Sequence, residues 1–196
     1  MIKCVSILGS TGSIGRQSLD IVKHLNIPVA ALTAGTSVER MAQQCREFKP
    51  ALAVMATQEA AKLLAVAIDG LDTEVAWGEE GLIRAATIAQ ADCVITAVVG
   101  MLGLKPTLEA IKAGKRIGLA NKETLVCGGA LVMGELEKKG LDILPIDSEH
   151  SALWQALGFR LDAPFKRLII TASGGPFYHY TEEELKKVTL ASALKH

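Results

Sequence analysis

The stretch Gly9-Ser-Thr-Gly-Ser-Ile-Gly15 sets the expected fold of this chain. It follows a short apolar run (2–8) that predicts a strand and precedes an amphipathic run (16–25) that predicts a helix. Gly9 and Gly12 allow a backbone to approach a phosphate, Gly15 allows the helix to pack close to the strand, and the first amides of the helix favour an anion. The spacing is G-x-x-G-x-x-G, not the common G-x-G-x-x-G, so a nucleotide phosphate site and an ordinary tight turn both stay open.

Apolar and amphipathic runs alternate along the rest of the chain, which predicts an α/β fold with a doubly wound, mostly parallel Rossmann-type sheet. The expected strands cover 29–33, 51–55, 73–77, 92–99, 116–119, 142–146 and 167–171. The expected helices cover 38–48, 57–68, 79–91 and 106–113, with side-chain caps at Thr57 and, for a later helix, at Thr181.

Composition narrows the class of protein. Of 196 residues 49% are apolar, and 21 Lys and Arg balance 21 Asp and Glu, which argues against nucleic acid or an anionic membrane as the main partner. The four cysteines form no C-x-x-C pair, so reduced thiols are expected instead of disulfides or a zinc site. No apolar run reaches the ~18 residues of a membrane helix, and the start leads directly into a strand without a signal peptide. We therefore expect a cytoplasmic protein.

The turn after the second strand favours NADP over NAD. An NAD-binding unit usually places an acidic residue there to hold the ribose 2′-OH, whereas this turn reads Ala34-Gly-Thr-Ser37. Small hydroxyls and the first amides of a helix suit a 2′-phosphate, and Arg40 adds charge one turn later. Thr36 and Glu39 have the spacing of a capping box, so a simple helix cap is the alternative.

Polar side chains follow the strand at 116–119. Asn121, Lys122 and Glu123 stand where ligands bind in open α/β sheets. Lys122 is suited to hold a substrate phosphate or hydroxyl, or to polarise a carbonyl, and its two neighbours to meet a nicotinamide or its ribose. The alternative is a surface turn with a capping residue.

Two carboxylates, Asp147 and Glu149, come directly after the strand at 142–146. They are hard oxygen ligands of the kind that Mg²⁺ or Mn²⁺ takes, but two make an incomplete site, so a third carboxylate is expected from elsewhere. A helix N-cap with acids at its positive end explains the same pattern. Further on, Ser173 precedes two glycines, in a turn that fits either a phosphate contact or no ligand.

Four motifs in this order resemble the 1-deoxy-D-xylulose 5-phosphate reductoisomerase family: GSTGSIG, LANKE, PIDSEHS and TASGGPF. The resemblance covers the whole chain, and the two middle motifs are its most specific part. It implies rearrangement of 1-deoxy-D-xylulose 5-phosphate with a divalent cation, then reduction by NADPH to 2-C-methyl-D-erythritol 4-phosphate, in isoprenoid biosynthesis.

The resemblance also implies roles for the residues that match these motifs. The cofactor residues are Thr11, Gly12, Ser13 and Ile14 for the pyrophosphate, Gly35, Thr36 and Ser37 for the 2′-phosphate, and Asn121 and Glu123 for the nicotinamide. The substrate contacts are Lys122, Ser148, Glu149, Ser173 and His196, the metal ligands are Asp147 and Glu149, and Lys122 and Glu149 are catalytic.

Two departures from the family limit these expectations. Some members carry a lysine at the position of Thr36, so the preference for NADP is less firmly supported here. Members are also longer than this chain, so we expect a piece of a longer, homodimeric protein. Residues 1–146 would be the NADP-binding domain and 147–196 the start of an α+β catalytic domain, inactive alone. The alternatives are an NADP-dependent dehydrogenase of the homoserine dehydrogenase kind and a non-catalytic dinucleotide-binding module.

Overall fold

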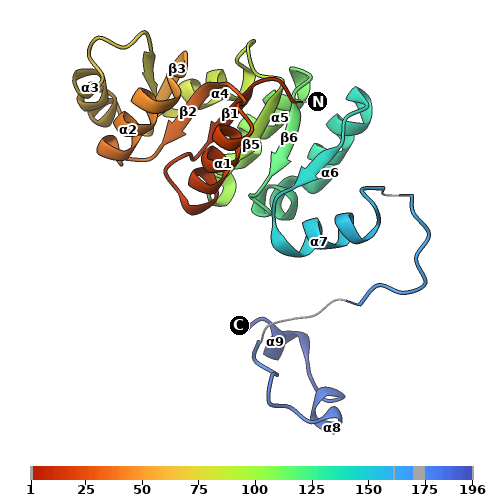
Figure 1. The fold of residues 1–196 in the computed structure, drawn as a ribbon. Helices are drawn as coiled ribbons and strands as arrows, with labels where there is room; N and C mark the ends of the chain where they lie inside the picture. The colour runs from red at the N-terminus through yellow and green to blue at the C-terminus, as the bar shows by residue number, and fades with distance from the viewer. Residues whose placement is uncertain (1, 161, 170–174, 196) are drawn as a thin grey trace. The chain divides into compact units, whose positions relative to one another are not determined.

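The computed structural model describes residues 2–160, 162–169 and 175–195, which belong to two compact units, Met1–Ala156 (unit 1) and Leu157–His196 (unit 2). Unit 1 is built on a seven-stranded sheet in the order β4-β3-β2-β1-β5-β6-β7 (Figure 1). Every strand pair in it is parallel. The prediction of a doubly wound Rossmann-type sheet is confirmed.

The elements of unit 1 alternate along the chain between strands and helices. The strands are β1 (Val5–Leu8), β2 (Val29–Ala34), β3 (Leu52–Met55), β4 (Glu74–Trp77), β5 (Cys93–Thr96), β6 (Arg116–Leu119) and β7 (Ile143–Pro145). The helices are α1 (Ser13–His24), α2 (Val38–Phe48), α3 (Gln58–Ala67), α4 (Gly78–Thr87), the 3₁₀ helix η1 (Gly100–Gly103), α5 (Leu104–Lys112), α6 (Glu123–Lys139) and α7 (Ser148–Ala156).

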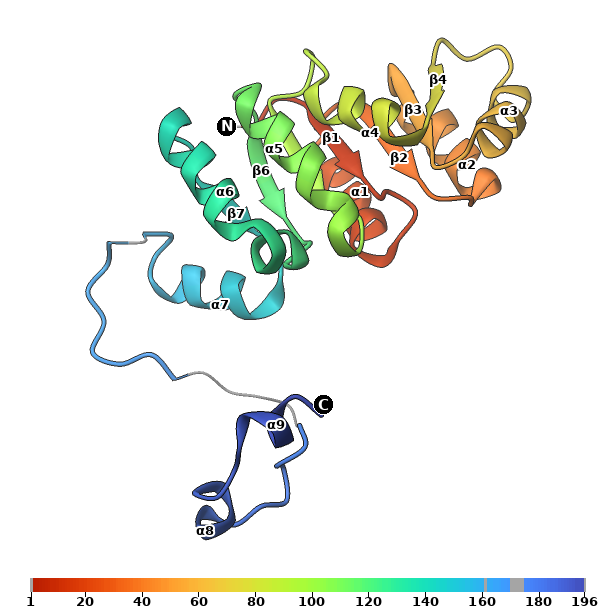
Figure 2. The same cartoon turned by 180° about the vertical axis from the view of Figure 1, so that it is seen from behind.

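Helices cover both faces of the sheet, because successive side chains of each strand point to opposite sides. In β1, Val5 and Ile7 join the cluster under α1, α2 and α3, and Leu8 joins the cluster under α4, α5 and α6. Figure 1 shows α1 and α2 in front of the sheet, and Figure 2 shows α4, α5 and α6 in front of its other face. The Ser6 hydroxyl donates to the Ala85 carbonyl of α4 at 2.7 Å, so a buried polar side chain is satisfied within this core.

The strand order reverses beside β1, which places a crevice there. The chain moves outward from β1 through β2 and β3 to β4, then returns to β5 on the other side of β1. The turns after β1 and β5 separate at the carboxyl ends of these strands, where Leu8 pairs with Thr96. Ligands of open α/β sheets bind at such a switch point.

Several element boundaries differ from the predicted ones; β1 begins at Val5 instead of residue 2, and α4 ends at Thr87 instead of residue 91. Helix α1 begins at Ser13 instead of Arg16, because extended Gly12 (φ −74°, ψ 178°) is its N-cap and the helix starts within the glycine motif. Strand β5 ends at Thr96 instead of residue 99, because its neighbours β1 and β6 end beside it and offer no further pairing.

Unit 2 has two short helices, α8 (Glu182–Leu185) and α9 (Leu190–Ala193). The predicted capping box is confirmed: the Glu184 amide donates to the Thr181 hydroxyl, and the Glu184 carboxylate accepts from the Thr181 amide. The strand predicted over 167–171 is wrong for residues 167–169, and the rest of it lies outside the described residues. Within the described part of unit 2 no other strand is present to pair with it, and a single strand is not stable.

All four cysteines lie in the described part of the chain. All four cysteines are free, and burial raises the pKa of the Cys45 and Cys93 thiols to about 11, which keeps them protonated and unreactive. Among the helices that the structure describes, none combines the length and the apolar character needed to cross a bilayer.

Lys115, in the turn between α5 and β6, is a buried cation, 9% exposed, whose ammonium lies beside the C-terminal end of α4. Its ammonium donates to the carbonyls of Ile88 at 2.8 Å and Ala91 at 2.6 Å, in the segment that follows this helix. A cation at a helix C-terminus satisfies carbonyls that have no partner within the helix and offsets the negative end of its dipole.

Replacing Lys115 by methionine should lower the free energy of unfolding by about 2 kcal/mol, because the buried carbonyls lose their donor while the side-chain volume is kept. Urea unfolding followed by circular dichroism measures this change. Lys112→Met is the matched control, because Lys112 is exposed and makes only a surface ion pair with Glu109. Equal stability of the two variants would contradict the assigned role of Lys115.

Candidate active site

A cleft of about 800 Å³ opens at the carboxyl ends of the strands around the switch point. Its lining includes Gly9 and Gly12 after β1, Gly35 after β2, Met55 at the end of β3 and Met101 in η1. Most of the lining is apolar, with polar groups from the turns, as in sites that hold a large organic ligand.

The glycine turn at the base of this cleft depends on close backbone approach. Gly9 has φ +86°, and a Cβ built on it would lie 2.6 Å from the Ala97 carbonyl oxygen. A Cβ on Gly15 would lie 2.2 Å from the Gly9 carbonyl oxygen. The third glycine therefore packs the helix against the turn itself, whereas the sequence predicted packing against the strand. The first hydrogen bond of the helix runs from the Arg16 amide to the Gly12 carbonyl at 3.0 Å. The amides before Arg16 in the first turn therefore have no acceptor within the helix.

The turn after β2 does not form the predicted capping box. The N-cap of α2 is Ser37, which makes no side-chain cap bond, so the pairing of Thr36 with Glu39 is wrong. The backbone explains the difference, because the Val38 amide donates to the Thr36 carbonyl at 2.9 Å and tightens the turn before the helix. Gly35, Thr36 and Ser37 are exposed and stay accessible to a ligand.

Arg40 lies against the glycine turn. Its Nη1 donates to the Thr11 carbonyl at 3.1 Å, which brings its positive charge beside the anion-binding amides of α1. The sequence predicts that the Arg40 charge lies near the turn after β2, whereas in the structure Arg40 donates a hydrogen bond to the turn after β1.

Asn121, at the end of β6, is buried and fully engaged within the protein. Its Nδ2 donates to the Gly100 carbonyl at 2.9 Å, and its Oδ1 accepts from the Thr124 amide at 3.3 Å. The side chain therefore holds η1, which lines the cleft, and accepts from an amide in the first turn of α6, whose N-cap is Lys122. The alternative of a surface turn is wrong for Asn121, which is buried. Lys122 and Glu123 are exposed beside it.

The structure brings Lys122 together with the carboxylates that follow β7. Strands β6 and β7 are neighbours, with Leu119 opposite Pro145, and the Ile146 amide donates to the Leu119 carbonyl at 3.0 Å. The positive charge of Lys122 acts to lower the pKa of both Asp147 and Glu149.

Asp147 is held ionised by its own helix. Burial of its carboxyl, which is 15% exposed, acts to raise its pKa, but hydrogen bonds from His150 and the charge of Lys122 outweigh this and lower the pKa. The His150 amide donates at 2.9 Å and its Nδ1 lies at 2.5 Å, both at Oδ1. The predicted N-cap is confirmed, and because it uses one carboxylate oxygen it is compatible with a metal at the other.

Glu149 stays exposed on the first turn of α7, and a hydrogen bond from Ser148 lowers its pKa. The two ionised carboxylates fit a hard divalent cation, but they are only part of its ligand set. Among residues 2–160, 162–169 and 175–195, no group of three or more His, Cys, Asp or Glu side chains is arranged to hold a metal. Ser173 and His196 lie outside the described residues.

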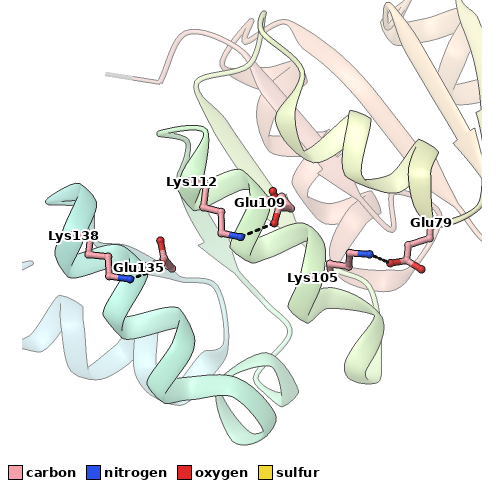
Figure 3. Close-up of polar contacts among 6 residues, drawn as sticks. All are labelled: Glu79, Lys105, Glu109, Lys112, Glu135 and Lys138. Atoms are coloured by element: carbon pink, nitrogen blue, oxygen red, sulfur yellow. Dashed lines mark hydrogen bonds and ion pairs between the residues drawn. The ribbon is translucent and has the colours of Figure 1, made fainter.

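One ion pair borders the cleft. Lys105 of α5 and Glu79 of α4 both line it, and their charged atoms are 2.5 Å apart (Figure 3). The other two pairs in Figure 3 join residues three apart within α5 and within α6. Such exposed pairs contribute little to stability, so this face of α4–α6 is an ordinary solvated surface away from the cleft.

Gln44 is a residue that the sequence analysis missed. It is 7% exposed and makes two hydrogen bonds to Ser10 of the glycine turn. Its signal was a polar residue on the apolar stripe of α2, where Met41, Cys45 and Phe48 share its face at helical spacing.

Comparison with known proteins agrees with this geometry. A family model described as 1-deoxy-D-xylulose 5-phosphate reductoisomerase matches residues 5–129, and one described as the C-terminal domain of that enzyme matches residues 143–196. The curated 1-deoxy-D-xylulose 5-phosphate reductoisomerases of Lachnospira eligens and Desulfitobacterium hafniense are each 50% identical over the whole chain. The chain spans 52% and 51% of their lengths.

Solved structures give the same result. The reductoisomerase of Zymomonas mobilis in complex with NADPH has a TM-score of 0.84 and 38% identity over the whole chain, which covers 52% of that protein. A DOX-P reductoisomerase in complex with NADPH, fosmidomycin and magnesium has a TM-score of 0.81 and 38% identity, over 97% of this chain and 50% of that one.

Gly15→Ala should lower the free energy of unfolding by about 3 kcal/mol, because the new methyl group overlaps the Gly9 carbonyl and backbone must move. Gly12→Ala is the matched control, since its Cβ would lie 3.5 Å from the same oxygen, and should cost under about 1 kcal/mol. Denaturant unfolding of both variants measures the difference. A larger loss for Gly12→Ala would show that the turn is packed differently.

The lowered pKa of Asp147 has a consequence for stability at acid pH. The folded state favours the ionised form of Asp147, so its carboxylate contributes to the free energy of unfolding. This stabilisation is present above the unfolded pKa of about 3.9 and is lost as pH falls through the lower folded pKa. His150→Ala should raise the pKa of Asp147, because one donor to the carboxylate is removed. Carboxyl ¹³C NMR titration measures it, with exposed Asp142 as internal reference. An unchanged Asp147 midpoint would contradict the His150 contact.

Proposed function

This chain belongs to the 1-deoxy-D-xylulose 5-phosphate reductoisomerase family, and from that premise we propose that its protein converts 1-deoxy-D-xylulose 5-phosphate to 2-C-methyl-D-erythritol 4-phosphate. The reaction would use NADPH and a divalent cation, Mg²⁺ or Mn²⁺, and would serve isoprenoid biosynthesis in the cytoplasm. Because the chain spans about half the length of its relatives, activity and a homodimeric assembly are proposed for the whole protein.

The observation that carries this proposal is the position of two different sites on one edge of the sheet. The cleft with its glycine turn lies over β1, β2 and β5, and Lys122 with Asp147 and Glu149 follows β6 and β7. A dinucleotide cleft adjacent to the Lys122 ammonium and two carboxylates suits a hydride transfer to a phosphorylated substrate that is chelated by a metal ion.

The cofactor site fits a dinucleotide phosphate. The turn over Thr11–Ile14 would bind the pyrophosphate through backbone amides, because the first helical hydrogen bond of α1 is made by the later Arg16 amide. The exposed turn Gly35–Ser37 would bind the 2′-phosphate with amides and hydroxyls. Glu123 would meet the nicotinamide side, and Asn121 would support it by holding η1.

At the second site, Lys122 would bind a substrate oxygen and favour negative charge on it. Asp147 and Glu149 would hold the cation, which supplies Lewis acidity to the substrate's oxygens when it is bound. Ser148 would contact the substrate beside them. Ser173 would bind its phosphate, and His196 would contact it as well, as the family resemblance implies.

The domain division proposed is 1–146 for the cofactor and 147–196 for the start of the catalytic domain. The 196-residue chain would bind NADPH but turn over little, because two carboxylates do not complete a metal site. Family membership favours this function over a homoserine dehydrogenase-like activity. A non-catalytic module would require that Lys122→Ala leave all ligand affinities unchanged.

Asp147→Asn should weaken Mn²⁺ binding by about tenfold, because a charged ligand oxygen is lost while the N-cap is kept. Titration followed by Mn²⁺ electron paramagnetic resonance measures this, and NADPH fluorescence tests whether the cofactor cleft is intact. Asp142→Asn is the matched control, since Asp142 is an exposed carboxylate just before β7. Equal Mn²⁺ affinity of both variants would support the dehydrogenase alternative and contradict the metal site.

A further inference from the structure

The glycine turn is held by a buried polar network between Ser10 and Gln44 of α2. Neither residue has a role in the proposed function. The Ser10 hydroxyl donates to Gln44 Oε1 at 2.7 Å, and Gln44 Nε2 donates back to the Ser10 carbonyl at 3.0 Å. Ser10 is 0% exposed and Gln44 is 7% exposed, so neither group has water as an alternative partner. The Thr33 carbonyl, at 3.2 Å, is a second acceptor within reach of the Ser10 hydroxyl, whereas the Ser10 carbonyl accepts from Gln44. A buried network of this kind favours one conformation of the backbone that it binds.

The same turn is tied to β2 through Thr33. The Thr33 carbonyl accepts from the amides of Gly9 at 3.1 Å and Ser10 at 2.8 Å, and the Thr33 hydroxyl accepts from the Gly9 amide at 2.9 Å. These amides are therefore turned inward and are not available to a ligand. The amides that can meet a ligand are the later ones, at the start of α1.

Helix α2 makes two of the contacts to the glycine turn. It also begins beside the turn Gly35–Ser37, which is proposed to bind the 2′-phosphate. Gln44 binds Ser10, and Arg40, one helical turn earlier, binds the Thr11 carbonyl at 3.1 Å. The N-cap of α2 is Ser37, in the exposed turn after β2. One rigid helix of 11 residues thus connects the glycine turn with the turn that would hold the 2′-phosphate.

We propose that Gln44 is a positioning residue for the dinucleotide, which fixes the glycine turn in its phosphate-binding conformation through Ser10. The inference rests on the proposed function, because it assigns the turn to the cofactor's pyrophosphate. Gln44 does not touch the ligand. It determines which backbone amides of the glycine turn face the cleft.

This role makes a specific statement about nucleotide selectivity. The pyrophosphate is common to NADPH and NADH, whereas the 2′-phosphate belongs to NADPH alone. Loss of Gln44 should weaken both nucleotides by the same factor and leave the ratio of their affinities unchanged. A residue that reads the 2′-phosphate would change this ratio instead.

The test compares Gln44→Leu with Gln43→Leu in the full chain. Gln43 is its exposed neighbour on α2, so the two substitutions are chemically the same, but Gln44 is buried and bonded to Ser10. NADPH and NADH dissociation constants, measured by fluorescence titration, should rise about tenfold for Gln44→Leu, because the buried Ser10 groups lose a hydrogen-bonding partner. Gln43→Leu should bind both nucleotides as the wild type does.

Ser10→Ala keeps the proposal testable if Gln44→Leu does not fold. It removes one of the two hydrogen bonds and should raise both dissociation constants by about threefold. The double variant should bind no more weakly than Gln44→Leu alone, because the two residues act through the same contact. Thermal melts identify the temperature at which every variant is folded, and Mn²⁺ affinity, which depends on the carboxylates after β7, should not change.

Three results would overturn the inference: unchanged NADPH affinity in folded Gln44→Leu, an equal loss in Gln43→Leu, or a changed ratio of NADPH to NADH affinity. A wild-type chain that binds neither nucleotide would instead overturn the proposed function on which the inference rests. Wild-type binding with unaffected variants would leave that function standing and remove only the role of Gln44.

Discussion

The close approach of Gly15 to the Gly9 carbonyl is the constraint on which the cofactor end of this molecule depends. A Cβ at residue 15 would lie 2.2 Å from that oxygen, so only glycine allows α1 to start directly on the turn. Because the helix starts there, its first amides follow directly on Gly12, which lines the cleft. Because Gly9 also packs against the Ala97 backbone, the turn is fixed to the end of β5, and the switch point becomes a defined cleft.

The parallel sheet brings the polar residues of the candidate site to the same edge as the glycine turn. All seven strands point the same way, so residues that follow β1, β2, β5, β6 and β7 meet at one edge although they are far apart in the chain. Asn121 shows how closely the parts depend on each other: one buried side-chain amide accepts from the first turn of α6 and also holds η1, which lines the cleft. Lys122 and Asp147 are brought near each other because β6 pairs with β7; burial acts to raise the pKa of Asp147, but hydrogen bonds from His150 and the charge of Lys122 lower it.

Much of this could be predicted, and each error has a local physical cause. The strands and helices of unit 1 follow from apolar periodicity, but α1 starts three residues early because Gly12 acts as an N-cap. The capping box at Thr36 is wrong because backbone bonding tightens that turn before the helix. Gln44 was overlooked because an apolar stripe was assumed to be core throughout, and the polar partner that explains it lies 34 residues away in sequence.

Local spacing and side-chain chemistry are enough to predict the fold class, the glycine turn and the residue types suited to phosphate, a metal ion and substrate. The use of each polar group depends on how the strands and helices pack. Packing of α2 against the turn after β1 pairs Arg40 with the Thr11 carbonyl and Gln44 with Ser10. For the Ser10–Gln44 pair, which is buried, the exclusion of water makes these hydrogen bonds obligatory.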